Sequence, residues 1–345
     1  MIKQIKELIW FLAVCCGFHY LFKRFNNGKY LILMYHGVSS DSITPLSWSQ
    51  VSINHFIWQM SFLKKHYQIF SLEEVIKKIK TGIELPKNTA VITFDDGFRN
   101  NYTIAYPILK QLSIPATIFL TTYFVDTKEI IWPDSLYLTI FHTKQTSLNL
   151  KMFGLGAFML NSASLKEEAW QNLKKRLKEY SSEEKDRIFH EILNQLKSTE
   201  IKENIINDAS ILTWEQIKEM HQSKLIDFGA HSVHHEILSK LNPDIMEKEI
   251  IDSCKTVQEK LKTQIISFAY PNGRPDDFTE KSKEILKSYG ALCAVTTIKG
   301  LNSLNEDLFA LKRISIGQSV SRNRFRLLIT GFIYWIEDLF KNHHQ

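Results

Sequence analysis

Residues 90–97 read AVITFDDG, a short uncharged run that ends in two adjacent aspartates and a glycine. Such a run is typical of a buried strand. Side chains alternate between the faces of a strand, but because the chain can turn at Gly97, Asp95 and Asp96 can both reach one cavity at the strand's end. Two neighbouring carboxylates repel each other unless a cation separates their roles, so we expect one to bind a metal ion and the other to act as a base. A solvated Asp-Gly turn is the alternative.

Similar runs alternate along the chain with amphipathic helical patterns such as residues 72–80 and 245–261. The strand-like runs lie at residues 30–36, 90–94, 116–120, 226–230, 265–270 and 292–296. This alternation predicts parallel strands joined by crossover helices, and therefore an α/β fold that is either a barrel or an open sheet. Because 44% of the 345 residues are hydrophobic, the chain can bury a sizeable core, which excludes a disordered or coiled-coil protein.

Residues from about 140 to 210 interrupt the alternation. They are rich in Lys, Glu, Leu and Asn, which predicts a helical insertion rather than an independent domain. A new helix is expected after Thr213, because Gln216 follows three residues later and completes a capping box. Trp214, in the first turn of that helix, is expected to pack in the core.

A second polar cluster, HSVHH at residues 231–235, follows another strand-like run. His231 and His235 are four residues apart, so on a helical turn their rings would lie on one face and converge on one ion. Two imidazoles and one carboxylate suit Zn²⁺, Co²⁺ or Fe²⁺ and leave positions open for water and substrate. His234 is expected to face solvent or the residues behind the ligands. A histidine-rich surface turn is the alternative.

With four further ordered motifs, the two clusters resemble the polysaccharide deacetylase family, that is, the NodB homology domain or carbohydrate esterase family 4. The further motifs are MYHGV at 34–38, YPIL at 106–109, PATIF at 115–119 and FAYPNG at 268–273. The resemblance implies a distorted barrel of about seven β/α units with a helical insertion. It also implies an enzyme that removes N-acetyl groups from hexosamines.

By the same resemblance, a divalent metal ion is held by Asp96, His231 and His235, with zinc favoured and cobalt the alternative. Asp95 is then the general base that takes a proton from the attacking water. In this family the metal ion and a backbone N–H of the third motif stabilise the oxyanion.

The third motif and the start of the insertion are expected to contact the substrate. The backbone N–H for the oxyanion would lie near Asn272, with Pro271 in the same turn. Tyr270 and Trp132 are expected to stack on sugar faces, and Trp132 stands where the insertion starts.

Two positions depart from the commoner family pattern. The arginine that usually opens the third motif and orients the catalytic aspartate is replaced by Ala269. Arg313 or Arg274 is expected to supply the missing charge, with an ordinary surface arginine as the alternative for either.

The second departure concerns the general acid, because the only histidines after His235 are His343 and His344 at the extreme tail. His36, at the end of the first strand, is the expected substitute, as in the family branch that acts on poly-N-acetylglucosamine. An imidazolium can donate a proton to the departing amine near neutral pH. A buried core histidine is the alternative.

Both ends of the chain are hydrophobic. Residues 8–22 are uncharged but shorter than the roughly 20 residues of a spanning helix, and Lys23 and Arg24 stand where a signal-peptide cleavage site needs small residues. We therefore expect residues 1–25 to be a membrane-anchor or interfacial segment, residues 26–320 the catalytic domain, and residues 321–345 an apolar and basic helix. Buried core helices are the alternative for both ends.

Charge and cysteine content restrict the partners. A net charge of +6 is mild; it does not point to nucleic acid, although it suits an anionic membrane surface. The four cysteines make neither a disulfide framework nor a paired CxxC zinc site. The basic residues around the N-terminal run slightly favour the cytoplasmic face of a bacterial inner membrane. Oligomeric state is not indicated.

These observations lead to the hypothesis of a metal-dependent N-deacetylase acting on an N-acetylated cell-envelope glycan or glycolipid. A deformylase or O-deacetylase of a related acyl sugar would use the same metal chemistry. A carbohydrate-binding member without turnover is the other alternative; the missing arginine of the third motif favours it, and the intact aspartates and histidines oppose it.

Overall fold

The computed structural model describes residues 2–40, 49–197, 203–263 and 267–342. The chain forms two compact units. Thr127–Ile211 is the smaller unit, and the flanking segments Met1–Asp126 and Leu212–Gln345 together form the larger one. The smaller unit begins before residue 140, because α6 (Trp132–His142) belongs to it.

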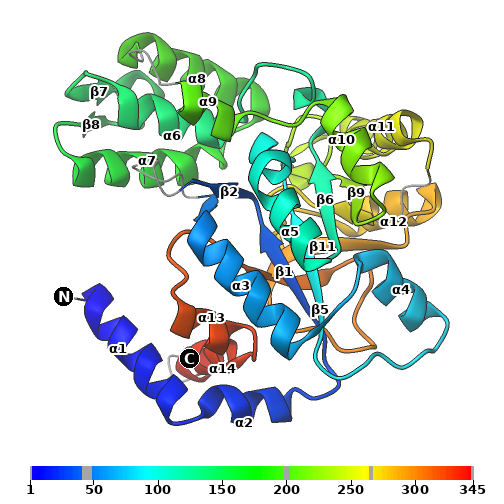
Figure 1. The fold of residues 1–345 in the computed structure, drawn as a ribbon. Helices are drawn as coiled ribbons and strands as arrows, with labels where there is room; N and C mark the ends of the chain where they lie inside the picture. Colours follow the sequence, from blue (N-terminus) through cyan, green and yellow to red (C-terminus); the bar gives the residue numbers. More distant parts are fainter. Residues whose placement is uncertain (1, 41–48, 198–202, 264–266, 343–345) are drawn as a thin grey trace. The chain divides into compact units, whose positions relative to one another are not determined.

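The larger unit is built on a closed barrel of seven parallel strands (Figure 1). They are β1 (Leu31–Tyr35), β5 (Thr89–Phe94), β6 (Ala116–Leu120), β9 (Ile226–Ala230), β10 (Ser267–Ala269), β11 (Cys293–Lys299) and β12 (Leu311–Ser315). β1 closes the barrel because it pairs with β12 on one side and with β5 on the other. The α/β barrel expected from the sequence is confirmed, and the open sheet is excluded.

The strands are buried on both faces, as expected when a barrel is filled inside and covered by helices outside. Every residue of β1, β5 and β6 is buried. Gly229 on β9 is required by close packing, because a Cβ there would lie 2.6 Å from the Phe119 ring and 2.8 Å from the Ser267 carbonyl oxygen. Residues 265 and 266 of the fifth expected strand lie outside the described residues.

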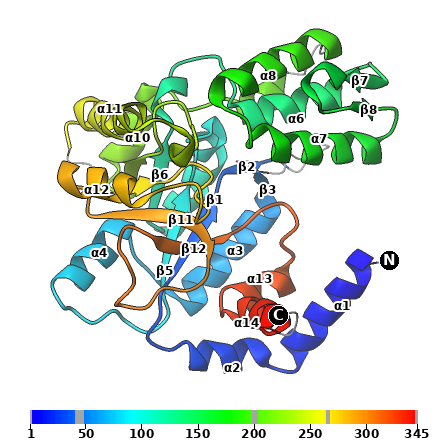
Figure 2. The ribbon, with the colours of Figure 1, turned by 180° about the vertical axis from the view of Figure 1, so that it is seen from behind.

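Helices surround the barrel in both views (Figure 2). They include α3 (Ile53–His66), α4 (Leu72–Lys80), α5 (Tyr106–Leu112), α10 (Trp214–Gln222), α11 (Pro243–Leu261) and α12 (Glu280–Tyr289). α10 begins with the expected capping box between Thr213 and Gln216. Trp214 is buried, as predicted.

The smaller unit is mainly helical. Beside α6 it contains α7 (Ala163–Leu177), α8 (Ser182–Leu196), α9 (Glu203–Ala209) and a two-stranded hairpin of β7 (Ser147–Asn149) and β8 (Ala157–Met159). Its core includes Trp170, whose ring packs edge-on against Tyr137.

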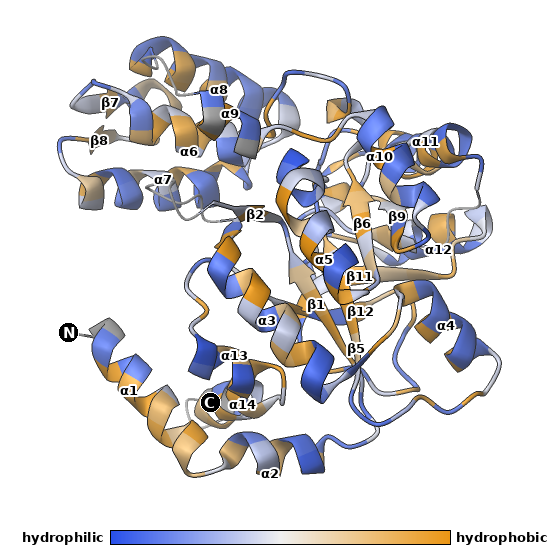
Figure 3. Cartoon of the chain, viewed as in Figure 1, coloured by the Kyte–Doolittle hydropathy of each residue, from blue (hydrophilic) through white to orange (hydrophobic). Residues whose placement is uncertain are grey.

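Four terminal helices pack together on the larger unit: α1 (Ile2–Cys15), α2 (Phe18–Phe25), α13 (Arg322–Leu328) and α14 (Phe332–Asn342). Phe22 joins the two ends of the chain, with its ring centroid 5.0 Å from that of Phe332 and 5.1 Å from that of Trp335. Among the described residues no single helix is long and apolar enough to cross a membrane; α1 and α2, bent by 67° at their junction, meet that criterion only as a pair. Figure 3 shows the apolar stretch of α1.

Candidate metal centre and active site

The chemically important side chains follow the carboxyl ends of neighbouring strands. Asp95 and Asp96 come directly after β5, His231 comes directly after β9, and Arg313 lies on β12. Because the barrel strands are parallel, their carboxyl ends meet at one mouth, which is where barrel enzymes place their active sites.

Asp96, His231 and His235 form the metal-ligand cluster. Oδ1 of Asp96 lies 3.6 Å from Nε2 of His231 and 3.3 Å from Nε2 of His235. One ligand atom from each residue falls within 4.8 Å of the others. The same Asp96 oxygen is buried and has no hydrogen-bond partner of normal geometry among the described residues. A buried carboxylate oxygen facing two imidazole nitrogens is the arrangement that a divalent cation would complete.

His231 is prepared to be a ligand in its neutral form. Its Nδ1 lies 2.7 Å from the carbonyl oxygen of Ala269. Burial lowers the pKa of His231 to about 4, so the ring is uncharged at neutral pH. Nδ1 therefore carries the proton and donates it to Ala269, which leaves the Nε2 lone pair directed at Asp96. Metal-binding histidines are commonly oriented by such a hydrogen bond.

The histidine loop is not helical, and the expectation of a helical turn is wrong. Ser232 and His235 have φ values of 62° and 60°, so two left-handed residues fold the loop back on itself. The rings of His231 and His235 are 4.9 Å apart and almost perpendicular, at 82°. Asp96 also has a left-handed φ of 71°, and strain of this kind concentrates at functional sites.

Glu249, on α11, holds the histidine loop from behind. Its Oε2 accepts hydrogen bonds from the backbone N–H groups of Val233 and His234, at 3.0 and 2.9 Å. Its Oε1 lies 2.6 Å from Nδ1 of His234. His234 thus faces away from the cluster, with 48% of its side chain exposed. The sequence interpretation missed Glu249, which lies mid-helix without a motif to mark it.

Arg313 clamps Asp95. Its two terminal nitrogens each donate to one carboxylate oxygen at 2.7 Å, and its Nε donates to the Thr296 carbonyl oxygen at 2.7 Å. Arg313 as a whole is only 1% exposed. Burial would raise the pKa of Asp95, but the charge and hydrogen bonds of Arg313 together with the neighbouring His231 outweigh it, so the pKa is lowered. Of the two expected arginines, Arg313 lies on the aspartate, whereas Arg274 is exposed.

His36 directly follows β1 at the same mouth. Tyr35 is in register with Phe94 on β5, so the next residues along the two strands, His36 and Asp95, are neighbours. The backbone carbonyl of His36 accepts a hydrogen bond from Nδ2 of Asn101 at 2.8 Å.

Tyr270, an aromatic residue of the third motif, lies in the interior of the protein. Tyr270 is fully buried; it stacks on Phe278 at 4.4 Å and donates to the Phe309 carbonyl oxygen, so it cannot stack on a sugar as expected. Pro271 is also buried, and Asn272 follows with a left-handed φ of 60°.

The other expected aromatic contact, Trp132, opens α6 of the smaller unit. Nζ of Lys185 lies 5.8 Å from its ring centroid. Trp132 therefore lies beside side chains of the smaller, helical unit.

Comparisons with known proteins identify relatives and similar folds. The sequence model of a family described as polysaccharide deacetylase matches residues 82–294. YxkH of Bacillus subtilis, named as a polysaccharide deacetylase, is 25% identical over 86% of this chain and 75% of its own length. The poly-beta-1,6-N-acetyl-D-glucosamine N-deacetylase of Staphylococcus epidermidis is 36% identical over 29% of this chain and 38% of its own length.

Two solved structures have a similar fold. The Streptococcus pyogenes deacetylase PplD has a TM-score of 0.57 at 23% identity, with 87% of this chain and 98% of that chain covered. IcaB from Ammonifex degensii has a TM-score of 0.55 at 18% identity, with 88% and 97% covered.

Proposed function

The chain belongs to the polysaccharide deacetylase family, and from this premise we propose that it is a metal-dependent hydrolase of N-acetyl groups on amino sugars. The observation that carries the proposal is the pairing of two different carboxylates at one mouth. Asp96 faces two imidazoles, whereas its neighbour Asp95 is held by Arg313. The two aspartates are thereby given separate tasks.

Asp96, His231 and His235 would hold the metal ion. A bound divalent metal would supply the Lewis acidity that activates water and polarises an acyl oxygen. Two imidazoles and a carboxylate are a zinc ligand set, with cobalt the alternative. His231 contributes a neutral nitrogen because its other nitrogen is committed to Ala269.

Asp95 would take the proton from the attacking water. Its lowered pKa keeps the carboxylate ionised at neutral pH, and each oxygen that accepts from Arg313 retains a lone pair for a proton. Arg313 fixes the plane of the carboxylate through two parallel hydrogen bonds, so it is a positioning residue that aims the base.

His36 would donate a proton to the departing amine, since it lies beside Asp95 at the end of β1. A backbone N–H at Asn272 would stabilise the oxyanion of the acyl group. These two roles rest on position at the mouth and on the ordered motifs of the family.

The proposed substrate is an N-acetylated cell-envelope glycan or a lipid-linked saccharide. Relatives named as poly-beta-1,6-N-acetyl-D-glucosamine N-deacetylases support the amino sugar. The hydrophobic terminal helices support a location at a bacterial inner membrane, with the cytoplasmic face favoured by the distribution of basic residues.

Acetate release from N-acetylglucosamine oligomers tests the proposal. The zinc-loaded protein should release acetate, the chelator-treated protein should not, and zinc should restore the activity. Asp95→Asn should lose it, while the matched variant Asp276→Asn, on an exposed residue near the third motif, should keep it. Equal turnover by Asp95→Asn and the wild type would refute the assigned base.

A further inference from the structure

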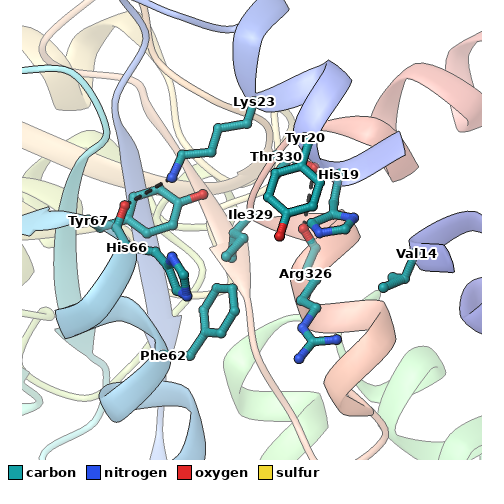
Figure 4. A pocket seen from close by; sticks show the side chains of 10 residues that line it. All are labelled: Val14, His19, Tyr20, Lys23, Phe62, His66, Tyr67, Arg326, Ile329 and Thr330. Carbon is teal, nitrogen blue, oxygen red and sulfur yellow. Dashed lines mark hydrogen bonds between the residues drawn. The ribbon is translucent and has the colours of Figure 1, made fainter. Parts of the chain in front are cut away.

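A cavity of about 260 Å³ lies among the terminal helices and α3. Figure 4 shows it, and we call it the basic pocket. Its basic lining consists of His19 and Lys23 of α2, His66 of α3 and Arg326 of α13. The volume is below the roughly 300–1,000 Å³ of sites for drug-sized ligands, so the pocket suits a small polar group rather than a saccharide.

The basic pocket carries positive charge without an acidic residue in its described lining. None of its lining residues is an aspartate or glutamate, and within the described part of the chain no carboxylate forms an ion pair with Lys23 or Arg326. Burial and the nearby charge of Arg326 lower the pKa of His19. Nδ1 of His19 is shielded from solvent and has no hydrogen-bond partner among the described residues. The pocket is therefore complementary to an anion.

The two cations are held in place without being neutralised. Lys23 donates to the backbone carbonyl of His66 at 2.9 Å, and its Nζ lies 4.5 Å from the Tyr67 ring centroid. The Arg326 guanidinium lies 5.5 Å from the ring centroid of Trp58 and 5.6 Å from that of Phe62. Carbonyl and aromatic contacts orient these groups but leave their charge available.

Many apolar side chains on the terminal helices are exposed. Leu8 of α1 is 57% exposed, Phe25 of α2 is 71% exposed, and Phe340 of α14 is 65% exposed. Further exposed apolar residues on these helices are Ile5, Ile9, Phe11, Leu12, Tyr20, Leu21, Trp335 and Leu339. Exposed apolar residues concentrated in this way mark an interaction surface, and amphipathic helices with basic residues typically lie in a lipid headgroup layer.

We propose that the basic pocket binds the phosphate of an anionic phospholipid while the exposed apolar side chains enter the acyl region beside it. This inference rests on the membrane location given with the proposed function and adds a specific headgroup site to it. The charge of the pocket and the exposed apolar side chains of the terminal helices together favour a lipid phosphate over a free anion, because a free anion gains nothing from the exposed apolar side chains.

Vesicle co-sedimentation tests the inference with the full chain. Vesicles of phosphatidylcholine alone are compared with vesicles of equal parts phosphatidylcholine and phosphatidylglycerol. The wild type should prefer the anionic vesicles. Each basic residue near a membrane surface contributes about fivefold to binding, so Lys23→Gln with Arg326→Gln should weaken anionic binding by roughly 25-fold. Lys23→Gln alone should weaken it about fivefold, which keeps the test valid if the double variant folds poorly.

The matched control removes two charges elsewhere. Lys248→Gln with Lys255→Gln changes exposed residues of α11 and should retain nearly all the anionic preference. Equal losses of anionic binding in the two double variants would show that binding depends on net charge alone. That result would overturn the proposal that the basic pocket binds the lipid phosphate. Thermal stabilisation by inorganic phosphate without any vesicle preference would make it a small-anion site and overturn the lipid assignment.

Acetate release from soluble oligomers, measured on the same samples, separates this inference from the catalytic proposal. The pocket variants should keep wild-type turnover because none of the changed residues lies at the barrel mouth. Lipid binding without turnover in the wild type would refute only the catalytic proposal.

Discussion

The barrel mouth and the terminal helices differ in how their charged side chains are paired. At the mouth, the buried charge of Asp95 is matched by Arg313, and Asp96 faces the two histidines. At the terminal helices, Lys23 and Arg326 line a cavity without any carboxylate. The ring of Tyr270, after β10, is buried, whereas that of Phe25 on α2 is exposed.

The difference separates a site that is preorganised from a surface that is complementary to something outside the chain. Fixed hydrogen bonds at the mouth cost no reorganisation when a reaction occurs. Uncompensated cations and exposed apolar groups at the termini gain free energy only when a partner covers them. Substitutions at the mouth should therefore change stability and catalysis, whereas substitutions at the termini should change association.

The largest effect is expected from Arg313→Met. It leaves the Asp95 charge buried without a partner, so the free energy of unfolding should fall by about 3–5 kcal/mol. Arg313→Lys keeps the charge but not the two parallel hydrogen bonds, so it should cost less stability while the misplaced base still reduces turnover about 100-fold. Urea denaturation and acetate release measure the two effects. Wild-type turnover in Arg313→Lys would show that aiming the carboxylate is unimportant.

A smaller effect is expected from Glu249→Gln. The amide nitrogen cannot accept a hydrogen bond, so the histidine loop loses part of its support, and zinc affinity should fall by about 10–100-fold. Competition with a chelator of known affinity measures the change. Glu247→Gln, on an exposed residue of the same helix, is the matched control. A similar loss of zinc affinity in Glu247→Gln would show that support of the histidine loop by Glu249 is not the cause.

Asp227 on β9 is a carboxylate of the barrel wall whose hydrogen bond with Ser71 and nearby Lys77 do not offset its burial. Burial and the charge of Glu73 raise its pKa to about 6. Because the folded pKa exceeds the unfolded value, this group contributes stability below about pH 4 that is lost as the pH rises through 6. Asp227→Asn should therefore stabilise the protein by about 1–2 kcal/mol at pH 7, allowing for its partial exposure, and by little near pH 4.

Urea denaturation at the two pH values checks this, with the exposed Asp252→Asn as the control. A stabilisation by Asp227→Asn that is independent of pH would show that the carboxyl is not titrating as described.

The smallest effect on stability is expected at the terminal helices. Phe25→Ser changes a side chain that is 71% exposed, so the free energy of unfolding should change by no more than about 0.5 kcal/mol. Binding to anionic vesicles should nevertheless weaken several-fold, because the ring no longer enters the acyl region. Ile83→Ser, 53% exposed after α4, should change neither quantity. Unchanged vesicle binding in Phe25→Ser would show that the exposed apolar side chains do not contact the membrane.

The α/β alternation and the cluster of Asp95, Asp96, His231 and His235 could be predicted from the sequence because they depend on local patterns, whereas the choice of a barrel over an open sheet rested on the resemblance to the family. Uncharged strand runs and the polar residues that end them are contiguous in the chain. The carboxyl ends of parallel strands then bring these residues to one mouth without further information.

Long-range and backbone features could not be predicted in the same way. Arg313 reaches Asp95 across 218 positions of sequence, and only its charge marked it as a candidate beside Arg274. The left-handed Ser232 and His235 replace the expected helical turn, since neither residue type requires that conformation. Tyr270 looked like a sugar-binding ring because its burial against Phe278 depends on tertiary packing.

Metal content measured beside turnover tests the separate roles of the two adjacent aspartates most directly. The wild type and Asp95→Asn should each retain about one zinc ion per chain, whereas Asp96→Ala should lose it. Only the wild type should release acetate. Loss of zinc from Asp95→Asn with full occupancy in Asp96→Ala would contradict the account, because the ligand and the base would then have been exchanged.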